Sequence, residues 1–285
     1  DHTPSSRTDN WTETVLGKIA KVGRIAGEVG ADAVLDGGDY FDIKSPVRNS
    51  HELVRRSIAV HRAYPCPVYA NVGNHDCVYG DYSFLPQQPL GVLYESGTFR
   101  RLYDEHEALF EDAEGYRVRV VGVPYHGVRY DDERFRRIER KGEDLLVAVA
   151  HLLASPTKTK MFEGEDIVRY DRLDAFAPDL WFFGHWHEDQ GISRTPGGKT
   201  VVNLGSLTRG ALSQDSLERD PSVAILRAGR DGVTIDRRSI EAAPPADIFT
   251  LEARERKDLR DEILVKMVDS LAVAILPSVQ TPLRD

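Results

Sequence analysis

Five short apolar runs, each long enough for one β-strand, end at a polar segment that could bind a metal. In chain order the segments are Gly37-Gly38-Asp39, Gly73-Asn74-His75-Asp76, His151, Gly184-His185-Trp186-His187 and Gly205-Ser206. In α/β sheets the loops beyond the carboxyl ends of the strands form the ligand crevice. The repeated pattern therefore predicts an α/β fold in which separate parts of the chain meet at one site.

Helical patterns separate the first of these strands. Apolar residues recur every three or four positions over residues 11–29, which predicts an amphipathic helix. A second helix is predicted over residues 50–63, and a basic helix over residues 134–141. Residues 223–226 and 233–240 have the pattern of a hairpin. The chain thus repeats strand, polar loop and helix before its last antiparallel strands.

The composition is that of a soluble globular protein. The chain has 285 residues, and its longest apolar run near the C-terminus is far shorter than the roughly 18 residues of a membrane span. We therefore expect a cytoplasmic protein that does not bind membranes. Because 46 acidic residues outnumber 37 basic ones, DNA binding would require local basic patches or metal ions. With only two cysteines, a disulfide framework and a four-cysteine zinc site are excluded.

Five polar residues at the strand ends form a mixed set of oxygen and nitrogen donors. They are the carboxylate of Asp39, the carboxamide of Asn74 and the imidazoles of His151, His185 and His187. Such a set suits Mn, Fe or Zn and disfavours metals that prefer thiolates. Each residue alone has a structural explanation, such as a helix cap, a turn or a buried histidine. Their occurrence together at strand ends predicts a metal centre.

The same segments resemble the sequence blocks of a known enzyme superfamily. Gly38-Asp39, Gly73-Asn74-His75-Asp76, His151 and Gly184-His185-Trp186-His187 resemble, in the same order, the GD, GNHD, H and GHxH blocks of the calcineurin-like metallophosphoesterases. The resemblance covers about residues 31–210. It implies a four-layer α/β/β/α sandwich, followed in this chain by a C-terminal helical tail.

The resemblance also implies how the donors are used. Asp39 would bridge two divalent metal ions, with Asn74, His151 and His185 on one ion and His187 on the other. Mn²⁺ is the expected metal, and Fe, Zn and Mg are alternatives.

His75 resembles the catalytic histidine of the family, which approaches the leaving oxygen without binding metal, and Asp76 would orient its imidazole. The implied reaction is hydrolysis of a phosphodiester by in-line attack of an activated water, without a covalent enzyme intermediate.

One block of the family is missing from the start of the chain. Family members open with a strand and a D-x-H block that completes the first metal site, whereas here Asp1 and His2 are adjacent. We expect the true pair to lie upstream of residue 1.

Three further segments resemble the SbcD-type DNA repair exonucleases. They are residues 4–11, residues 203–209 and residues 248–263. This resemblance implies a DNA substrate, either single-stranded or at duplex ends, and an SbcC-type ATPase partner. The alternatives are an enzyme for small phosphoesters, nucleotides or phosphoproteins, and a non-catalytic subunit of a DNA-end complex.

Four residues are candidates for substrate binding. Arg209 belongs to the nuclease-like block at residues 203–209, and Trp186 could stack on a base or pack beside the metals. Arg134 and Arg137 could contact backbone phosphates, although they could equally belong to a solvated helix face.

The last part of the chain is predicted to be a separate segment. Pro244 and Pro245 mark a boundary between a phosphoesterase domain at residues 1–243 and a linker with a helical tail at residues 244–285. In the tail, Ile263, Met267 and Leu271 share one helical stripe that must be buried. The stripe could pack on the chain's own core, on a second copy in a homodimer, or on an ATPase partner, and we favour a role in assembly.

Overall fold

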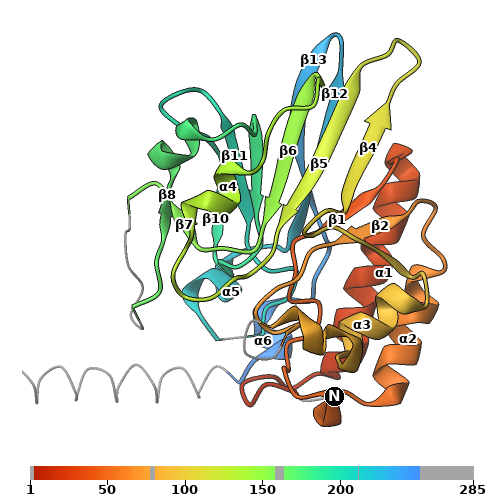
Figure 1. The fold of residues 1–285 in the computed structure, drawn as a ribbon. Helices are drawn as coiled ribbons and strands as arrows, with labels where there is room; N and C mark the ends of the chain where they lie inside the picture. The colour runs from red at the N-terminus through yellow and green to blue at the C-terminus, as the bar shows by residue number, and fades with distance from the viewer. Residues whose placement is uncertain (1–2, 78–80, 158–163, 211, 251–285) are drawn as a thin grey trace, which may run out of the picture.

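A parallel sheet covered by helices is built from the first part of the chain. The computed structural model describes residues 3–77, 81–157, 164–210 and 212–250 (Figure 1). The sheet contains β1 (Val34–Asp36), β2 (Val68–Ala70) and β3 (Phe99–Arg101). The helices of this part are α1 (Trp11–Val29), α2 (His51–His61) and α3 (Pro89–Glu95). Apolar side chains of α2 and α3 pack against one face of the sheet.

A six-stranded sheet forms the second half of the sandwich. Its strand order is β10-β11-β9-β6-β5-β4, with parallel pairing in the centre and an antiparallel strand at each edge. The strands are β4 (Glu107–Glu111), β5 (Arg117–Val123), β6 (Leu145–Ala150), β9 (Leu180–Phe183), β10 (Asp189–Arg194) and β11 (Thr200–Leu204).

Strand β6 shows why the two sheets pack together. All six of its residues are buried, and because successive side chains of a strand point to opposite faces, the strand contributes to two cores. Leu145, Val147 and Val149 lie in the core that also contains Leu35 of β1 and Tyr69 of β2. The alternate residues of β6 lie in the core with α4 (Asp132–Arg136) and the 3-10 helix η3 (Tyr170–Ala175). The predicted four-layer α/β/β/α sandwich is therefore confirmed.

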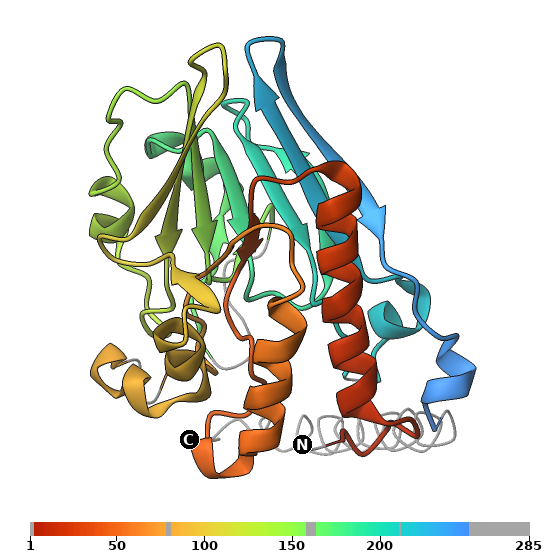
Figure 2. The same ribbon diagram turned by 90° about the vertical axis from the view of Figure 1, so that its right-hand side faces the viewer.

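The remaining elements extend these layers. The hairpin of β12 (Ser222–Gly229) and β13 (Gly232–Ser239) lies beside α1 (Figure 2), where Arg238 is 3.0 Å from Glu28. The short elements are β7 (Ala154–Ser155), β8 (Val168–Arg169), α5 (Gln214–Glu218), α6 (Pro245–Ile248) and the 3-10 helices η1 (Pro46–Arg48) and η2 (Tyr82–Gln87). None of the helices in the described part of the chain has both the length and the apolar character of a membrane span.

The basic helix predicted over residues 134–141 is wrong in its bounds. Helix α4 begins earlier, because Asp131 caps it by accepting a hydrogen bond from the Glu133 amide, and it ends at Arg136. Beyond that point Arg140 pairs with Asp179, and Lys141 pairs with Glu107. The segment beyond Arg136 is therefore not helical, and its charged side chains pair with other parts of the fold.

Residues 244–250 pack against the start of the chain. Arg7 forms a β-bridge with Phe249, and the Thr250 amide donates to the Ser6 carbonyl at 2.9 Å. The Arg7 guanidinium lies over both the Trp11 and the Phe249 ring, 4.7 and 4.9 Å from their centroids. The domain boundary at residue 243 stays a prediction, and the predicted helical tail at residues 251–285 lies outside the described residues.

Candidate metal centre

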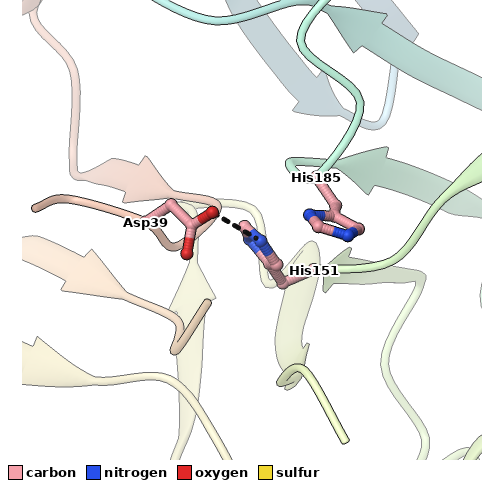
Figure 3. A group of neighbouring side chains, drawn as sticks. All are labelled: Asp39, His151 and His185. Carbon is pink, nitrogen blue, oxygen red and sulfur yellow. Dashed lines mark ion pairs between the residues drawn. The ribbon is translucent and has the colours of Figure 1, made fainter. Parts of the chain in front are cut away.

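Three of the predicted ligands converge at the carboxyl ends of the strands. Asp39 follows β1, His151 follows β6 and His185 follows β9, so the two sheets bring them together. One donor atom from each of the three lies within 4.8 Å of the others. Figure 3 shows the Asp39 carboxylate directed at His151, with the His185 ring beside them. The predicted convergence of separate segments is seen directly in these three residues.

Glycines allow the loops to approach so closely. A Cβ on Gly184 would lie 2.6 Å from the Gly37 carbonyl oxygen, so a side chain there would push the β1 and β9 loops apart. Asp39 itself has a positive φ of 58°, which is uncommon for a residue other than glycine. Its amide donates to the Asp76 carboxylate at 2.6 Å, and this contact helps to hold the strained backbone.

His151 is fixed with one ring nitrogen free to bind a metal. The side chain is fully buried, and Nδ1 is 2.8 Å from the Gly37 carbonyl oxygen, so Nδ1 carries the proton. Nε2 then lies 3.2 Å from the Asp39 carboxylate and 3.2 Å from the Asn74 side-chain oxygen. Burial opposes protonation of His151, but the Asp39 carboxylate outweighs it and raises the pKa of the imidazole. Asn74 thus joins the predicted ligand group.

The donor set fits a divalent cation. The Nδ1 atom of His185 is buried and has no hydrogen-bond partner among the described residues. Burial alone would raise the pKa of Asp39, but the nearby His151 holds it below its usual range, so the carboxylate is ionised. A carboxylate, an amide oxygen and imidazole nitrogens that face one another are ligands that Mn, Fe and Zn accept. A bound cation would give the unpaired nitrogen its partner.

Trp186 and His187 follow His185 directly in the sequence. The charges of Asp39, His185 and His151 act on the pKa of His187, which is lowered mainly because its imidazole is partly desolvated. His187 is therefore near the group, although it is not one of the three residues within 4.8 Å. Trp186 is 7% exposed and packs with Leu153 and Ile167, which favours packing over base stacking.

His75 lies next to the ligands but is not one of the group of Asp39, His151 and His185. Its backbone amide donates to the Asp39 carboxylate at 2.7 Å, and its side chain is 30% exposed. The imidazole Nδ1 contacts the backbone carbonyl of Asp42, and the Asp42 carboxylate is 3.9 Å away. With Nδ1 engaged, Nε2 is the nitrogen left for a substrate.

The expected role of Asp76 differs from its contacts. Its buried carboxylate accepts hydrogen bonds from the backbone amides of Asp39 and Gly73. Among the described residues, Asp76 makes no contact with the His75 imidazole. Burial and the Asp39 carboxylate raise the pKa of Asp76 to about 7. Asp76 therefore shapes the loop, and Asp42 takes the position expected for a partner of the imidazole. Sequence reasoning missed Asp42, although it lies only three residues after Asp39.

The four candidates for substrate contact have different environments. Arg134 is partly buried, Arg137 is exposed, and neither forms an ion pair with a described residue. Arg209 is only 2% exposed and donates to the Ala243 carbonyl. Arg209 was predicted to bind substrate, but its side chain is enclosed by the fold. Trp186, as described above, is packed inside.

Glu165 is a functional candidate that the sequence did not reveal. Its carboxylate is 3.1 Å from Nε2 of His185 and accepts a hydrogen bond from the Tyr130 hydroxyl at 3.0 Å. Burial alone would raise the pKa of Glu165, but the His185 imidazole and the Tyr130 hydroxyl lower it, so it is ionised. A carboxylate on one ring nitrogen fixes the tautomer of a ligating histidine. No spacing rule links Glu165 to His185, so only the fold could reveal the pair.

Glu165→Gln is expected to weaken metal binding by about 10- to 100-fold, the usual effect of losing such a partner. The substitution keeps the shape of the side chain but removes the charge that holds His185 with Nδ1 facing the other ligands. Titration calorimetry with Mn²⁺ measures the change. Glu133→Gln, an exposed glutamate on α4, is the matched control and should bind as the wild type does. Wild-type affinity in Glu165→Gln would contradict the assigned contact.

Comparisons with known proteins agree with this geometry. The sequence model described as calcineurin-like phosphoesterase matches residues 12–189. None of the curated proteins matches the chain by sequence. One solved crystal structure is similar with a TM-score of 0.51 and 13% identity, over 79% of this chain and 94% of that chain. The crystal structure of TT1561 of Thermus thermophilus is similar with a TM-score of 0.47 and 15% identity, over the same shares of the two chains.

The family match covers more than half of the chain and includes Asp39, Asn74, His75, His151 and His185. The structural likeness at a TM-score of 0.51 supports the fold alone. The match, the strand-end ligands and the four-layer sandwich lead to one conclusion. The chain belongs to the calcineurin-like phosphoesterase family.

Proposed function

We propose that the chain is a DNA nuclease that hydrolyses phosphodiester bonds in single strands or at duplex ends, with Mn²⁺ as the expected metal. The general activity, metal-dependent hydrolysis of phosphoesters, follows from the family. The observation that carries the proposal is the group of Asp39, His151 and His185, which lies beside a partly exposed His75. This arrangement supplies both metal ligands and a group that can act on a leaving oxygen.

Two of the three nuclease-like segments, residues 4–11 and 203–209, pack against each other, which supports the choice of DNA. The Arg7 side chain, in residues 4–11, donates to the Arg209 carbonyl at 3.1 Å, in residues 203–209. In the second segment, the Ser206 amide donates to the His187 carbonyl at 2.9 Å. The segments that resemble nucleases therefore form one unit that reaches the candidate metal centre.

In the proposed reaction the residues of the chain bind the metal ions and donate a hydrogen bond or a proton to the leaving oxygen. Asp39, Asn74, His151, His185 and His187 would hold the ions, which when bound supply Lewis acidity against the charge that grows on the phosphoryl oxygens.

In the proposal His75 directs Nε2 at the leaving oxygen. Because Nδ1–H donates to the Asp42 carbonyl, Nε2 carries a proton only in the imidazolium form, and it is this form that gives the leaving oxygen a hydrogen bond or a proton. Departure of an alkoxide is otherwise slow at neutral pH, so this contact accelerates the step that water alone performs poorly.

Local cations must overcome the repulsion between DNA and a chain of net charge −9. In the basic segment after β5, Arg136, Arg140 and Lys141 each have a carboxylate partner. Arg134 and Arg137 have none among the described residues, so their charges remain available. Burial raises the pKa of the Tyr82 hydroxyl, and the charge of Arg134 opposes this rise, so Arg134 lies near Tyr82. Tyr82 in turn donates a hydrogen bond to the Tyr125 carbonyl. Since the Tyr125 ring is 5.5 Å from the His185 ring, Arg134 is the better placed of the two for a phosphate.

The proposal is tested on the full-length protein, stripped with EDTA and then supplied with Mn²⁺. Labelled single-stranded oligonucleotides and blunt duplexes are compared with mononucleotides and a phosphopeptide. We expect cleavage of the oligonucleotides that requires Mn²⁺ and falls sharply in Asp39→Asn. Hydrolysis of nucleotides or the phosphopeptide without cleavage of DNA would overturn the nuclease proposal and favour a small-molecule or protein phosphoesterase. The absence of any metal-dependent hydrolysis would favour a non-catalytic subunit.

Removal of residues 251–285 is expected to abolish association with an SbcC-type ATPase or a second copy, while cleavage of short oligonucleotides persists. The cut is placed after Thr250 because residues 244–250 pack on Arg7 and Ser6. Light scattering and co-purification measure assembly, and circular dichroism measures folding. Unfolding or loss of cleavage in the shortened protein would place the tail in the core.

A further inference from the structure

A small cavity beside α1 is lined by two buried cations, Lys18 and Arg209. It has a volume of about 220 Å³ and lies between α1, Arg209 and the residues that follow β13. Lys18 and Arg209 line it and are only 4% and 2% exposed. A cavity of this size is below the roughly 300–1,000 Å³ of pockets for drug-sized ligands but holds several times the ~30 Å³ share of one water.

Neither of these cations has a carboxylate partner among the described residues. The Lys18 ammonium donates to the Leu207 carbonyl at 3.3 Å, and the Arg209 guanidinium donates to the Ala243 carbonyl. The Nε atom of Arg209 is buried without any hydrogen-bond partner in the described part of the chain. Buried charges are normally paired, because an unpaired ion loses its hydration without compensation.

The nearby carboxylates are already engaged by other cations. Of the basic groups beside the cavity, Arg7 pairs with Asp9 at 2.7 Å, and Arg219 pairs with Asp215 at 2.8 Å. The exposed Asp220 acts on Arg209 only through its charge and does not line the cavity.

The two carboxylates that line the cavity are also paired. Glu241 is 3.1 Å from Lys21, and Glu13 is 2.6 Å from Arg56. The cavity therefore faces an excess of positive charge. Burial, followed by the charges of Arg209 and Arg7, lowers the pKa of Lys18 to about 8, as expected for a cation that lacks a counter-ion.

We propose that this cavity binds a small tetrahedral oxyanion of the phosphate type, held by Lys18 and Arg209. The anion would supply the negative charge that the two cations lack and would accept hydrogen bonds from the free N–H groups of both side chains. Because Lys18 also holds the Leu207 carbonyl, the bound anion would tie α1 to the segment that reaches His187. The site is separate from the metal ligands, and its existence does not depend on DNA being the substrate.

The test uses metal-free full-length protein and inorganic phosphate, with chloride at equal ionic strength as the reference. Binding only to the folded state should raise Tm by about 5 °C when phosphate is at a hundredfold excess over Kd. Lys18→Met should abolish this shift, and it should be at least as stable as the wild type without phosphate because an unpaired buried charge is removed. Lys44→Met, which changes an exposed lysine, is the matched control and should keep the shift.

Asp39→Asn, measured in the same way, separates this cavity from the metal centre and should keep the phosphate shift. A shift of equal size in Lys18→Met, or no shift in the wild type, would overturn the proposal. A shift that appears only with a 5′-phosphorylated oligonucleotide, and not with inorganic phosphate, would also overturn it, since the cavity is too small for a nucleoside with its phosphate. Because no hydrolysis is measured, these outcomes are independent of the nuclease proposal.

Discussion

His75→Ala is expected to lower turnover by about 10²- to 10⁴-fold while metal binding persists. The loss follows from removing the imidazole, whose Nε2 is the nitrogen available to a leaving oxygen. The contact of residue 75 with the ligands is made by its backbone amide, which donates to the Asp39 carboxylate and remains in the alanine variant. Turnover is measured on a labelled oligonucleotide and on a chromogenic phosphodiester, and Mn²⁺ binding is measured by calorimetry.

A second histidine provides the control for this variant. His106 is exposed and lies before β4, away from the ligands, so His106→Ala should retain both turnover and metal binding. Loss of Mn²⁺ binding in His75→Ala would mean that the imidazole is a ligand, and wild-type turnover would remove it from the reaction. The chromogenic substrate has a good leaving group, so its hydrolysis should depend less on His75 than cleavage of DNA does.

Local patterns in the sequence predict the elements that position the site. The apolar spacing over residues 11–29 predicts α1 with its observed bounds, and Gly30 ends the helix at a φ of 62°. The polar segments that follow β1, β2, β6 and β9 meet as predicted. Parallel pairing places the carboxyl ends of β1 and β2 together in one sheet and those of β6 and β9 together in the other, and His151 contacts Gly37 and Asn74 across the two sheets. Helix periodicity and strand ends are properties of short stretches of chain, so they can be read without the fold.

Contacts between distant segments are harder to predict. The pair of Glu165 and His185 depends on the tertiary position of Glu165, three residues before β8, and the sequence around Glu165 has no periodic pattern. Asp76 was expected to face the His75 imidazole, yet its carboxylate turns inward to the backbone amides of the loop. Arginine is a residue type that often binds phosphate, but Arg209 is buried and donates to the carbonyl of Ala243, shortly after β13. In each case the residue type is informative, whereas the direction of the side chain is set by tertiary packing.

In the proposed two-ion site, Asp39→Asn is expected to weaken the binding of both ions together, by more than the roughly 10- to 100-fold effect of losing an outer partner of a ligand. The Asp39 carboxylate is the only one in the group of three donors, and it lies 3.2 Å from Nε2 of His151. Asparagine tolerates a positive φ about as well as aspartate, so the φ of 58° can be kept and the change isolates the charge. Calorimetry with Mn²⁺ gives the affinity and number of sites, and added Mn²⁺ should restore only part of the activity.

Asp104→Asn is a control that makes the same chemical change at a residue whose backbone also has a positive φ. Asp104 is the other described residue besides glycine with a positive φ, at 53°, and it is exposed and outside the ligand group. If metal binding is lost in Asp39→Asn because of charge, Asp104→Asn should bind Mn²⁺ as the wild type does, and both variants should have similar Tm without metal. Two sites of full affinity in Asp39→Asn would remove this carboxylate from the metal centre. Loss of one site alone would show that Asp39 binds a single ion, because a bridging carboxylate cannot be removed from one ion and kept on the other.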